Sequence, residues 1–259
     1  MTPDSHIAVS LERISKSFGN KKVLHDVSFQ VAAGEALCIL GRSGTGKSVT
    51  LKMIIALLLP DAGKIWIDKD EITALKTEEL SRVRRKIGFL FQDAALFDSV
   101  TLYENLALPL LRLTNKSKEE IDADVDKVLR QVGLSADKKT MPSELSGGMR
   151  KRAGLARALV LEPKILLADE PTSGLDRITA SEIDELLLQQ KAERQTTVIV
   201  VTHDVIGARR VGDRFAVFDK GHLVAHGTAA EVESSDNETA RQLISLSHAE
   251  IEPRARRGA

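Results

Sequence analysis

The stretch GRSGTGKS, residues 41–48, follows the apolar run ALCIL (residues 36–40) and precedes the run VTLKMIIALLL (residues 49–59). The first run predicts a strand and the second a helix. A glycine, four further residues and then Gly-Lys-Ser, placed between a strand and a helix, is the spacing of a phosphate-binding loop. We therefore expect a nucleoside triphosphate to contact the residues of this loop, namely Gly41, Arg42, Ser43, Gly44, Thr45, Gly46, Lys47, Ser48 and Val49.

The residue types in this loop suit phosphate chemistry. Glycines let backbone N–H groups approach phosphate oxygens, the Lys47 ammonium reaches the terminal phosphates, and the Ser48 hydroxyl can bind Mg²⁺. A glycine-rich turn with an unrelated lysine is the alternative. The strand before the loop and the helix after it argue against that alternative.

The composition is typical of a globular protein, since the 259 residues are 42% hydrophobic and 29% charged. Lys plus Arg and Asp plus Glu both number 37, so the formal net charge is +0 and nothing predicts a nucleic-acid partner. The single cysteine, Cys38, excludes a disulfide framework. The longest apolar run is shorter than the roughly 20 residues that cross a bilayer, and no signal peptide is evident. We expect a cytoplasmic chain that acts on a membrane only through a partner.

The hydrophobic pattern changes along the chain. Residues 7–31 alternate apolar and polar positions around two short turns, which is typical of antiparallel strands with one buried face. Later apolar runs are continuous, which favours parallel strands buried on both faces. These later strands are expected at residues 36–40, 86–92, 164–170 and 196–204.

Helical patterns at residues 101–113 and 118–134 interrupt the strands. They predict a helical subdomain inserted at about residues 93–150. After it, a hairpin turning at residues 220–221 and a pair of helices within residues 229–248 are expected.

The predicted fold class is α/β. It combines a P-loop NTPase core and a mostly parallel sheet with an N-terminal antiparallel β-layer and the helical subdomain. We expect this domain to span residues 7–247 and to be followed by a flexible tail at residues 248–259.

Four polar residues follow the predicted parallel strands, where ligands bind at the carboxyl edge of a sheet. Asp169 can hold Mg²⁺, commonly through water, and Glu170 is placed to act as a general base for an attacking water. His203 can contact a γ-phosphate, and the side-chain carbonyl of Gln92 can bind Mg²⁺ or water. The alternatives are a solvated or helix-capping Asp-Glu pair, a structural histidine and a glutamine in a surface turn.

The order of these motifs resembles that of the ATP-binding-cassette (ABC) family over about residues 7–230. The resemblance implies ATP and Mg²⁺ as ligands, with Lys47, Glu170 and His203 in catalysis and Ser48, Gln92 and Asp169 at the metal. The family's motifs fall on Gly41 to Ser48 (Walker A), Gln92 (Q-loop), Leu145 to Met149 (signature), Ile165 to Asp169 (Walker B), Ser173 to Asp176 (D-loop) and His203 (H-loop).

Phe18 matches the aromatic residue that stacks on adenine in this family. Many members have tyrosine at that position, so phenylalanine keeps the stacking face and lacks only a hydroxyl. A core position within the β-layer is the alternative for Phe18.

The segment SELSGGMRKRAGLARAL, residues 143–159, predicts a second helix start suited to anions. In the ABC family two such domains pair head to tail, and the signature of one closes over ATP held by the other. The resemblance therefore implies a homodimer in which Ser146, Gly147, Gly148 and Asp176 contact the partner's ATP.

Three cations, Arg150, Lys151 and Arg152, lie in the first turn of that helix, where the helix dipole disfavours them by about 0.3–1 kcal/mol each. A bound polyphosphate would offset this cost. The alternative for each cation is a solvated side chain or a pair with Glu144 or another acidic group.

Met149 stands where the family usually has glutamine. With the segment FQDAALFDSVTLYENLALPL, residues 91–110, it resembles the ATPases of Mla-type (Mce-associated) phospholipid transporters. That resemblance implies membrane permease subunits and an Mce-domain lipid-binding protein as partners, at the cytoplasmic face of a bacterial inner membrane. Related motifs occur in amino-acid and methionine importers, so the ATPase of a small-solute importer is an alternative. Two further interpretations are a soluble ABC ATPase outside transport and a non-catalytic regulator that binds ATP.

Overall fold

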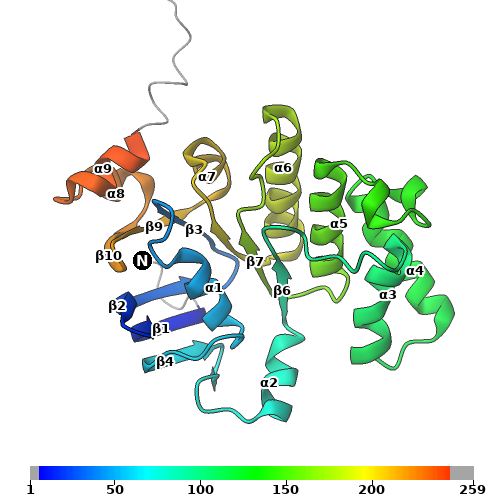
Figure 1. Ribbon diagram of the computed structural model, residues 1–259, viewed down its shortest axis with the longest axis horizontal. Coiled ribbons are helices and arrows are strands. Elements are labelled where there is room, and N and C mark those ends of the chain that lie inside the picture. Colours follow the sequence, from blue (N-terminus) through cyan, green and yellow to red (C-terminus); the bar gives the residue numbers. More distant parts are fainter. Residues whose placement is uncertain (1–5, 246–259) are drawn as a thin grey trace, which may run out of the picture.

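Two β-sheets form the centre of the structure, a computed structural model that describes residues 6–245. Their strands are β1 (Ile7–Phe18), β2 (Lys21–Ala32), β3 (Ala36–Gly41), β4 (Ala62–Ile67), β5 (Asp70–Glu71), β6 (Ile87–Leu90), β7 (Ile165–Asp169), β8 (Thr197–Val201), β9 (Arg214–Asp219) and β10 (His222–Gly227). Within the described residues, one sheet has the order β2-β1-β4-β5 and the other the order β10-β9-β3-β8-β7-β6 (Figure 1).

The strand directions confirm the predicted fold class. Each neighbouring pair in the four-stranded sheet is antiparallel. In the six-stranded sheet β10 runs antiparallel to β9, and the remaining neighbours are parallel. The expected hairpin joins β9 to β10 at Lys220 and Gly221, whose φ angles of 45° and 83° suit the turn type that matches strand twist.

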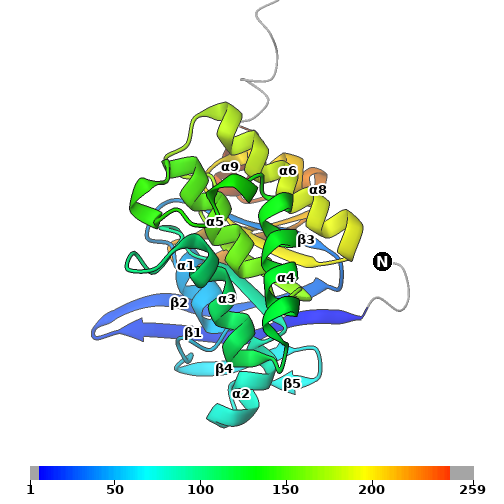
Figure 2. The same ribbon diagram turned by 90° about the vertical axis from the view of Figure 1, so that its right-hand side faces the viewer.

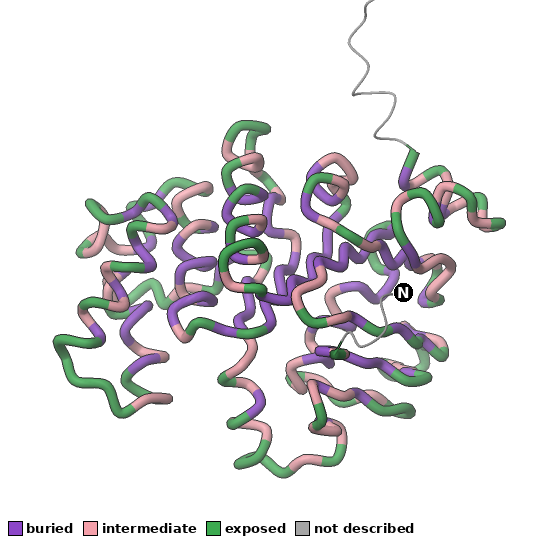
Figure 3. Tube along the Cα trace, turned by 180° about the vertical axis from the view of Figure 1, so that it is seen from behind, coloured by how far each residue is buried: buried purple, intermediate pink, exposed green. Residues whose placement is uncertain are grey.

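Side chains of β3 alternate between two hydrophobic cores, one on each face of the six-stranded sheet. Cys38 and Leu40 belong to the core beneath the helices, whereas Leu37 and Ile39 belong to the core shared with the antiparallel sheet. The buried trace in Figure 3 is concentrated in the central strands. Burial on both faces explains why these strands are continuously apolar in sequence.

Helices cover the six-stranded sheet, and some of them form a group beyond one end of it. They are α1 (Lys47–Ile54), α2 (Thr77–Arg84), α3 (Leu102–Leu113), α4 (Lys118–Gln131), α5 (Gly147–Leu159), α6 (Arg177–Arg194), α7 (Val205–Val211), α8 (Ala229–Glu233) and α9 (Glu238–Ser245), with 3-10 turns η1 (Ser135–Asp137) and η2 (Pro142–Glu144). Helices α3, α4 and α5 are grouped at the end away from β1 and β2 (Figures 1 and 2). Between residues 6 and 245, none of the helices combines the length and hydropathy of a membrane span.

Two expectations differ from the observed elements. Strand β4 pairs with β1 and extends the N-terminal sheet, where the sequence predicted strands only up to about residue 31. Helix α1 begins at Lys47 and ends at Ile54, whereas the sequence predicted residues 49–59. Its end is capped from outside, because the Arg84 guanidinium donates hydrogen bonds to the carbonyls of Ile55 (3.0 Å) and Ala56 (2.8 Å). The expected tail at residues 248–259 lies outside the described residues, as do residues 246–247.

Candidate functional site

The phosphate-binding loop joins β3 to α1, as the sequence predicted. Two glycines in it hold backbone positions that a side chain would disturb. Gly46, the N-cap of α1, has φ 99°, and a Cβ there would lie 2.4 Å from Cδ2 of Leu24. Gly41 has φ 150°, and a Cβ there would lie 2.4 Å from the carbonyl oxygen of Phe218. The loop can therefore keep its backbone close to neighbouring strands and leave its N–H groups for a ligand.

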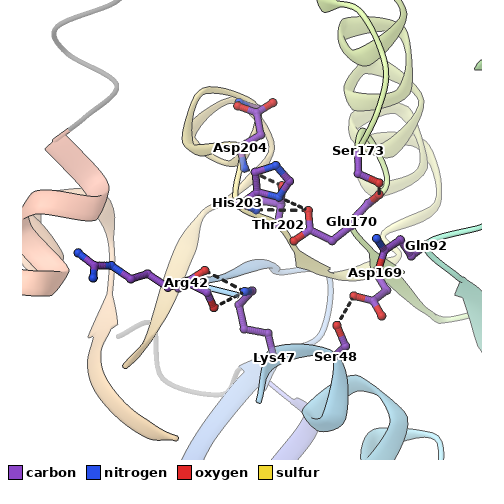
Figure 4. Close-up of polar contacts among 12 residues, drawn as sticks. Arg42, Lys47, Ser48, Gln92, Asp169, Glu170, Ser173, Thr202, His203 and Asp204 are labelled. Atoms are coloured by element: carbon purple, nitrogen blue, oxygen red, sulfur yellow. Dashed lines mark hydrogen bonds and ion pairs between the residues drawn. The ribbon is translucent and has the colours of Figure 1, made fainter. Parts of the chain in front are cut away.

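The Lys47 ammonium lies against its own loop. It donates hydrogen bonds to the carbonyl oxygens of Gly41 (2.8 Å) and Arg42 (3.0 Å). Burial lowers the pKa of Lys47, while the carboxylates of Glu170 and Asp169 act in the opposite direction. The loop carbonyls thus hold the cation at the place where phosphates would enter, and Glu170 and Asp169 lie across the site from it (Figure 4).

Ser48 and Asp169 meet across the site although 121 residues separate them. The Ser48 hydroxyl donates a hydrogen bond of 2.7 Å to Oδ1 of Asp169, which is buried at the end of β7. Gln92 follows β6 and lines the same cavity as Ser48. A hydroxyl, a carboxylate and an amide carbonyl are oxygen donors of the kind that suits Mg²⁺.

Glu170 and His203 form a pair at the ends of β7 and β8. Oε2 of Glu170 lies 2.7 Å from Nδ1 of His203, with 13% of the Glu170 side chain and 69% of the His203 side chain exposed. Glu170 has φ 48°, and its N–H donates to the carbonyl of Val201 at 2.8 Å. Such strained backbone is common at functional sites. The carboxylate can accept a proton from a water molecule while the imidazole fixes its orientation.

Lys47, Ser48, Gln92, Glu170 and His203 line one cavity of about 800 Å³, and Asp169 contacts Ser48 beside it. Its lining comprises Phe18, Lys21, Val23, Ser43, Gly44, Gly46, Lys47, Ser48, Val49, Gln92, Glu170 and His203. Phe18 is 47% exposed, so it is not a core residue of the β-layer.

Sequence reasoning missed Lys21 and Val23 in this cavity. Phe18 pairs with Lys21 across the turn between β1 and β2. The period-2 pattern places Val23 two residues further along, and this could have suggested both positions.

The signature and the D-loop lie elsewhere on the same chain. Ser146 is the N-cap of α5, and its hydroxyl oxygen accepts a hydrogen bond of 3.3 Å from the N–H of Met149. Asp176 is the N-cap of α6; hydrogen bonds from Thr179, through its backbone N–H and its hydroxyl, lower the pKa of this carboxyl. A Cβ on Gly148 would lie 2.5 Å from Cγ2 of Thr179, so the two helix starts are in contact. The predicted partner contacts, Ser146, Gly147, Gly148 and Asp176, do not line the Walker A cavity.

The three cations of the signature helix differ in burial: Lys151 is buried, Arg152 is half-buried and Arg150 is exposed. Each donates to a backbone carbonyl; the alternative of a solvated side chain is wrong for the buried Lys151 and stays a prediction for the exposed Arg150. The acceptors are Leu145 for Arg150, Gln92 and Glu170 for Lys151, and Val132 for Arg152. Lys151 shares the buried face of α5 with Gly154, Leu155 and Ala158, and that helical spacing was the signal in the sequence.

Known proteins are similar to this chain in sequence and architecture. The family model described as ABC transporter matches residues 24–173. The probable ribonucleotide transport ATP-binding protein mkl of Mycobacterium leprae (strain TN) is 44% identical over 238 residues, which are 92% of this chain and 69% of mkl. The methionine import ATP-binding protein MetN 1 of Bacillus anthracis is 42% identical over 228 residues, 86% of this chain and 66% of MetN 1. The chain thus spans about two thirds of the length of these relatives.

Solved structures agree with the fold. The ATP-binding cassette MJ0796, in a dimeric post-hydrolysis state bound to ADP and Pi, has a TM-score of 0.80 and 36% identity, covering 85% of this chain and 98% of that one. CbiO1 from Clostridium perfringens, part of the ABC transporter complex cbiONQ, has a TM-score of 0.80 and 28% identity, covering 96% of this chain and 98% of that one. The chain therefore belongs to the ABC transporter family and is an ATP-hydrolysing, ATP-binding subunit of that family.

Proposed function

We propose that two copies of the chain, paired head to tail, hydrolyse ATP at two composite sites. The observation that carries this proposal is the cavity in which the Walker A loop, Gln92, Glu170 and His203 converge, while Ser146 and Asp176 lie outside it. A signature that is remote from its own phosphate loop is free to close over ATP held by a partner. The dimeric state of MJ0796 with ADP and Pi supports this arrangement.

Four side chains of the cavity take part directly in this proposed reaction. Phe18 stacks on adenine through its exposed ring. Glu170 takes the proton of the attacking water, and His203 orients Glu170 and contacts the γ-phosphate. Lys47 stabilises the charge that develops on the transferring phosphoryl group.

The oxygen donors at this site fit Mg²⁺. Ser48 would bind it directly, Asp169 through water, and Gln92 through its side-chain carbonyl. When bound, Mg²⁺ neutralises charge on the β- and γ-phosphates. The paired Ser48 hydroxyl and Asp169 carboxylate already place two of these donors together.

The proposed substrate is phospholipid, moved between the membranes of a bacterial envelope. In this proposal the chain lies on the cytoplasmic face of the inner membrane, bound to permease subunits and acting with an Mce-domain lipid-binding protein. Dimer closure would reach the permease through Gln92 and the helical subdomain at residues 93–150. The support is the signature LSGGM with Met149, together with the segment at residues 91–110.

A second candidate is the import of a small solute. It is favoured by the 42% identity to a methionine import protein and by the name of mkl, which refers to ribonucleotide transport. Both relatives are named as ATP-binding proteins, so the sequence identity bears on the ATP-binding function more than on the transported molecule.

Reconstitution separates these candidates. The chain would be purified with the permease that co-purifies with it and placed in vesicles. ATP-dependent transfer of a fluorescent phospholipid to acceptor vesicles would be followed. Uptake of methionine and of ribonucleotides would be measured in the same vesicles, with Glu170→Gln as the inactive control. ATP-driven methionine or ribonucleotide uptake without lipid transfer would refute the phospholipid proposal.

A further inference from the structure

Lys151 is a buried cation that joins three segments of the site. Only 7% of the residue is exposed. Its ammonium donates hydrogen bonds to the carbonyl of Gln92, to the carbonyl of Glu170 at 3.0 Å and to the hydroxyl of Ser173 at 3.2 Å. Figure 4 shows these three acceptor residues beside one another. An ammonium has three N–H donors, so each acceptor uses one of them.

The contact with Glu170 is made where the backbone is strained. Glu170 has φ 48°, a conformation that a residue with a side chain keeps only when its surroundings enforce it. Its carbonyl also accepts hydrogen bonds from the N–H of Ser173 at 3.2 Å and from the hydroxyl of Ser173 at 3.0 Å. Lys151 and Ser173 therefore fix the peptide from which the Glu170 carboxylate extends toward His203.

The same face of α5 holds the segment after Gln92. A Cβ on Gly154 would lie 2.8 Å from Cβ of Ala94, so α5 and this segment are in close contact. The Arg157 guanidinium donates to the carbonyls of Ala94 at 3.1 Å and Ala95 at 2.6 Å. Lys151 and Arg157 are thus two cations of α5 that bind backbone carbonyls of residues 92–95. Of these two, Lys151 also contacts Glu170 and Ser173.

We propose that Lys151 is a positioning residue for ATP hydrolysis, which sets Glu170 and Gln92 by binding their backbone carbonyls to the signature helix. The inference rests on the proposed ATP site and deepens it. The start of α5, capped by Ser146, would contact the partner's ATP. Lys151 connects this helix to Glu170, the general base of the chain's own site.

The test compares variants of the full chain in its assembled complex. Lys151→Met removes the three hydrogen bonds, and Lys151→Arg keeps a cation with several donors. Arg152→Met is a matched control, because Arg152 is the next cation of α5 and donates to Val132, outside the site. For each variant kcat, KM for ATP, nucleotide affinity and melting temperature would be measured.

We expect Lys151→Met to lower kcat by at least about 10-fold, since small misplacements of catalytic groups have effects of that order. KM and nucleotide affinity should stay within about 3-fold of the unaltered protein, because the phosphate loop and Phe18 are untouched. Lys151→Arg should recover much of kcat. Arg152→Met should lower the melting temperature and leave kcat within about 3-fold of the unaltered protein.

Several results would overturn the inference. These are an unchanged kcat in Lys151→Met, a loss of kcat in Arg152→Met as large as in Lys151→Met, or a Lys151→Arg variant as inactive as the methionine variant. The arginine variant keeps the test decisive even where the methionine variant folds poorly. A protein without any substitution that does not hydrolyse ATP would overturn the proposed function as well, whereas the other results leave that function standing.

Discussion

Replacing Asp184 with asparagine is expected to stabilise the protein more at about pH 8 than at about pH 4.5, by about 1–2 kcal/mol. Asp184 lies on α6 and is 7% exposed. A Cβ added to Gly207 of α7 would lie 2.9 Å from Oδ2 of Asp184 and 2.9 Å from Oδ2 of Asp204, so the two carboxylates flank the same glycine. Burial, and then the neighbouring Asp204, raise the pKa of Asp184 from 3.8 to about 6, with Arg210 opposing.

The sign of the effect follows from proton binding. Between the unfolded pKa of 3.8 and the folded pKa of about 6, the folded protein holds a proton on Asp184 that the unfolded chain has released. Stability is therefore lost as the pH rises through this window. At about 1.4 kcal/mol per pH unit the loss approaches about 3 kcal/mol. Between about pH 4.5 and pH 8 we expect roughly half of it, because part of the window lies below pH 4.5 and the cleft beside Asp184 admits solvent.

Urea unfolding of the unaltered protein and of Asp184→Asn at both pH values would measure this difference. Glu182→Gln is the control, since Glu182 is an exposed carboxylate on the same helix. Asparagine keeps the shape of the side chain and cannot ionise, so its benefit should grow with pH. A benefit that is equal at the two pH values, or equal to that of Glu182→Gln, would refute the reasoning.

Three further predictions concern the nucleotide site. Glu170→Gln should lower steady-state phosphate release in the assembled complex by about 10²–10⁴-fold, as loss of a general base does, and normal turnover would contradict the assignment. Phe18→Ala should weaken ATP binding in a nucleotide titration by about 1–3 kcal/mol through lost stacking, with kcat at saturation retained. Gly46→Ala should lower the free energy of unfolding by about 1–3 kcal/mol, because the new methyl meets Leu24 at a φ of 99°. Gly44→Ala, where a Cβ meets nothing within 4 Å, should cost less; equal losses would exclude the steric explanation.

The sequence predicted the elements that depend on residues close to one another along the chain. The glycine-lysine-serine spacing identified the phosphate loop, and the continuous apolar runs identified the buried strands. Because parallel strands end at a common edge, the polar residues that follow them, Gln92, Asp169, Glu170 and His203, could be expected near one another. Gln92, Glu170 and His203 line one cavity, and Asp169 contacts Ser48 beside it.

The contacts that escaped prediction depend on backbone shape far away in sequence. Lys151 binds carbonyls that lie 59 and 19 residues away in the sequence. The nearer one belongs to Glu170, whose backbone has a left-handed conformation. A sequence pattern does not show which backbone carbonyls accept side-chain hydrogen bonds. The lysine in the first turn of α5 was therefore interpreted as solvated or facing phosphate. Strand β4 was missed for a related reason. Only Ile65 and Ile67 alternate into the core there, which is too short a pattern to distinguish a strand.

Ser146 carries a consequence for screening variants of this protein. Its hydroxyl oxygen is engaged as the acceptor for the N–H of Met149, which leaves the hydroxyl hydrogen available to donate to an anion. Aspartate caps a helix as well as serine does and adds a favourable charge at the helix start. It has no hydrogen to donate and would repel phosphate. A selection for thermal stability would thus accept aspartate at this position, and only a selection that requires the partner's nucleotide to bind would reject it.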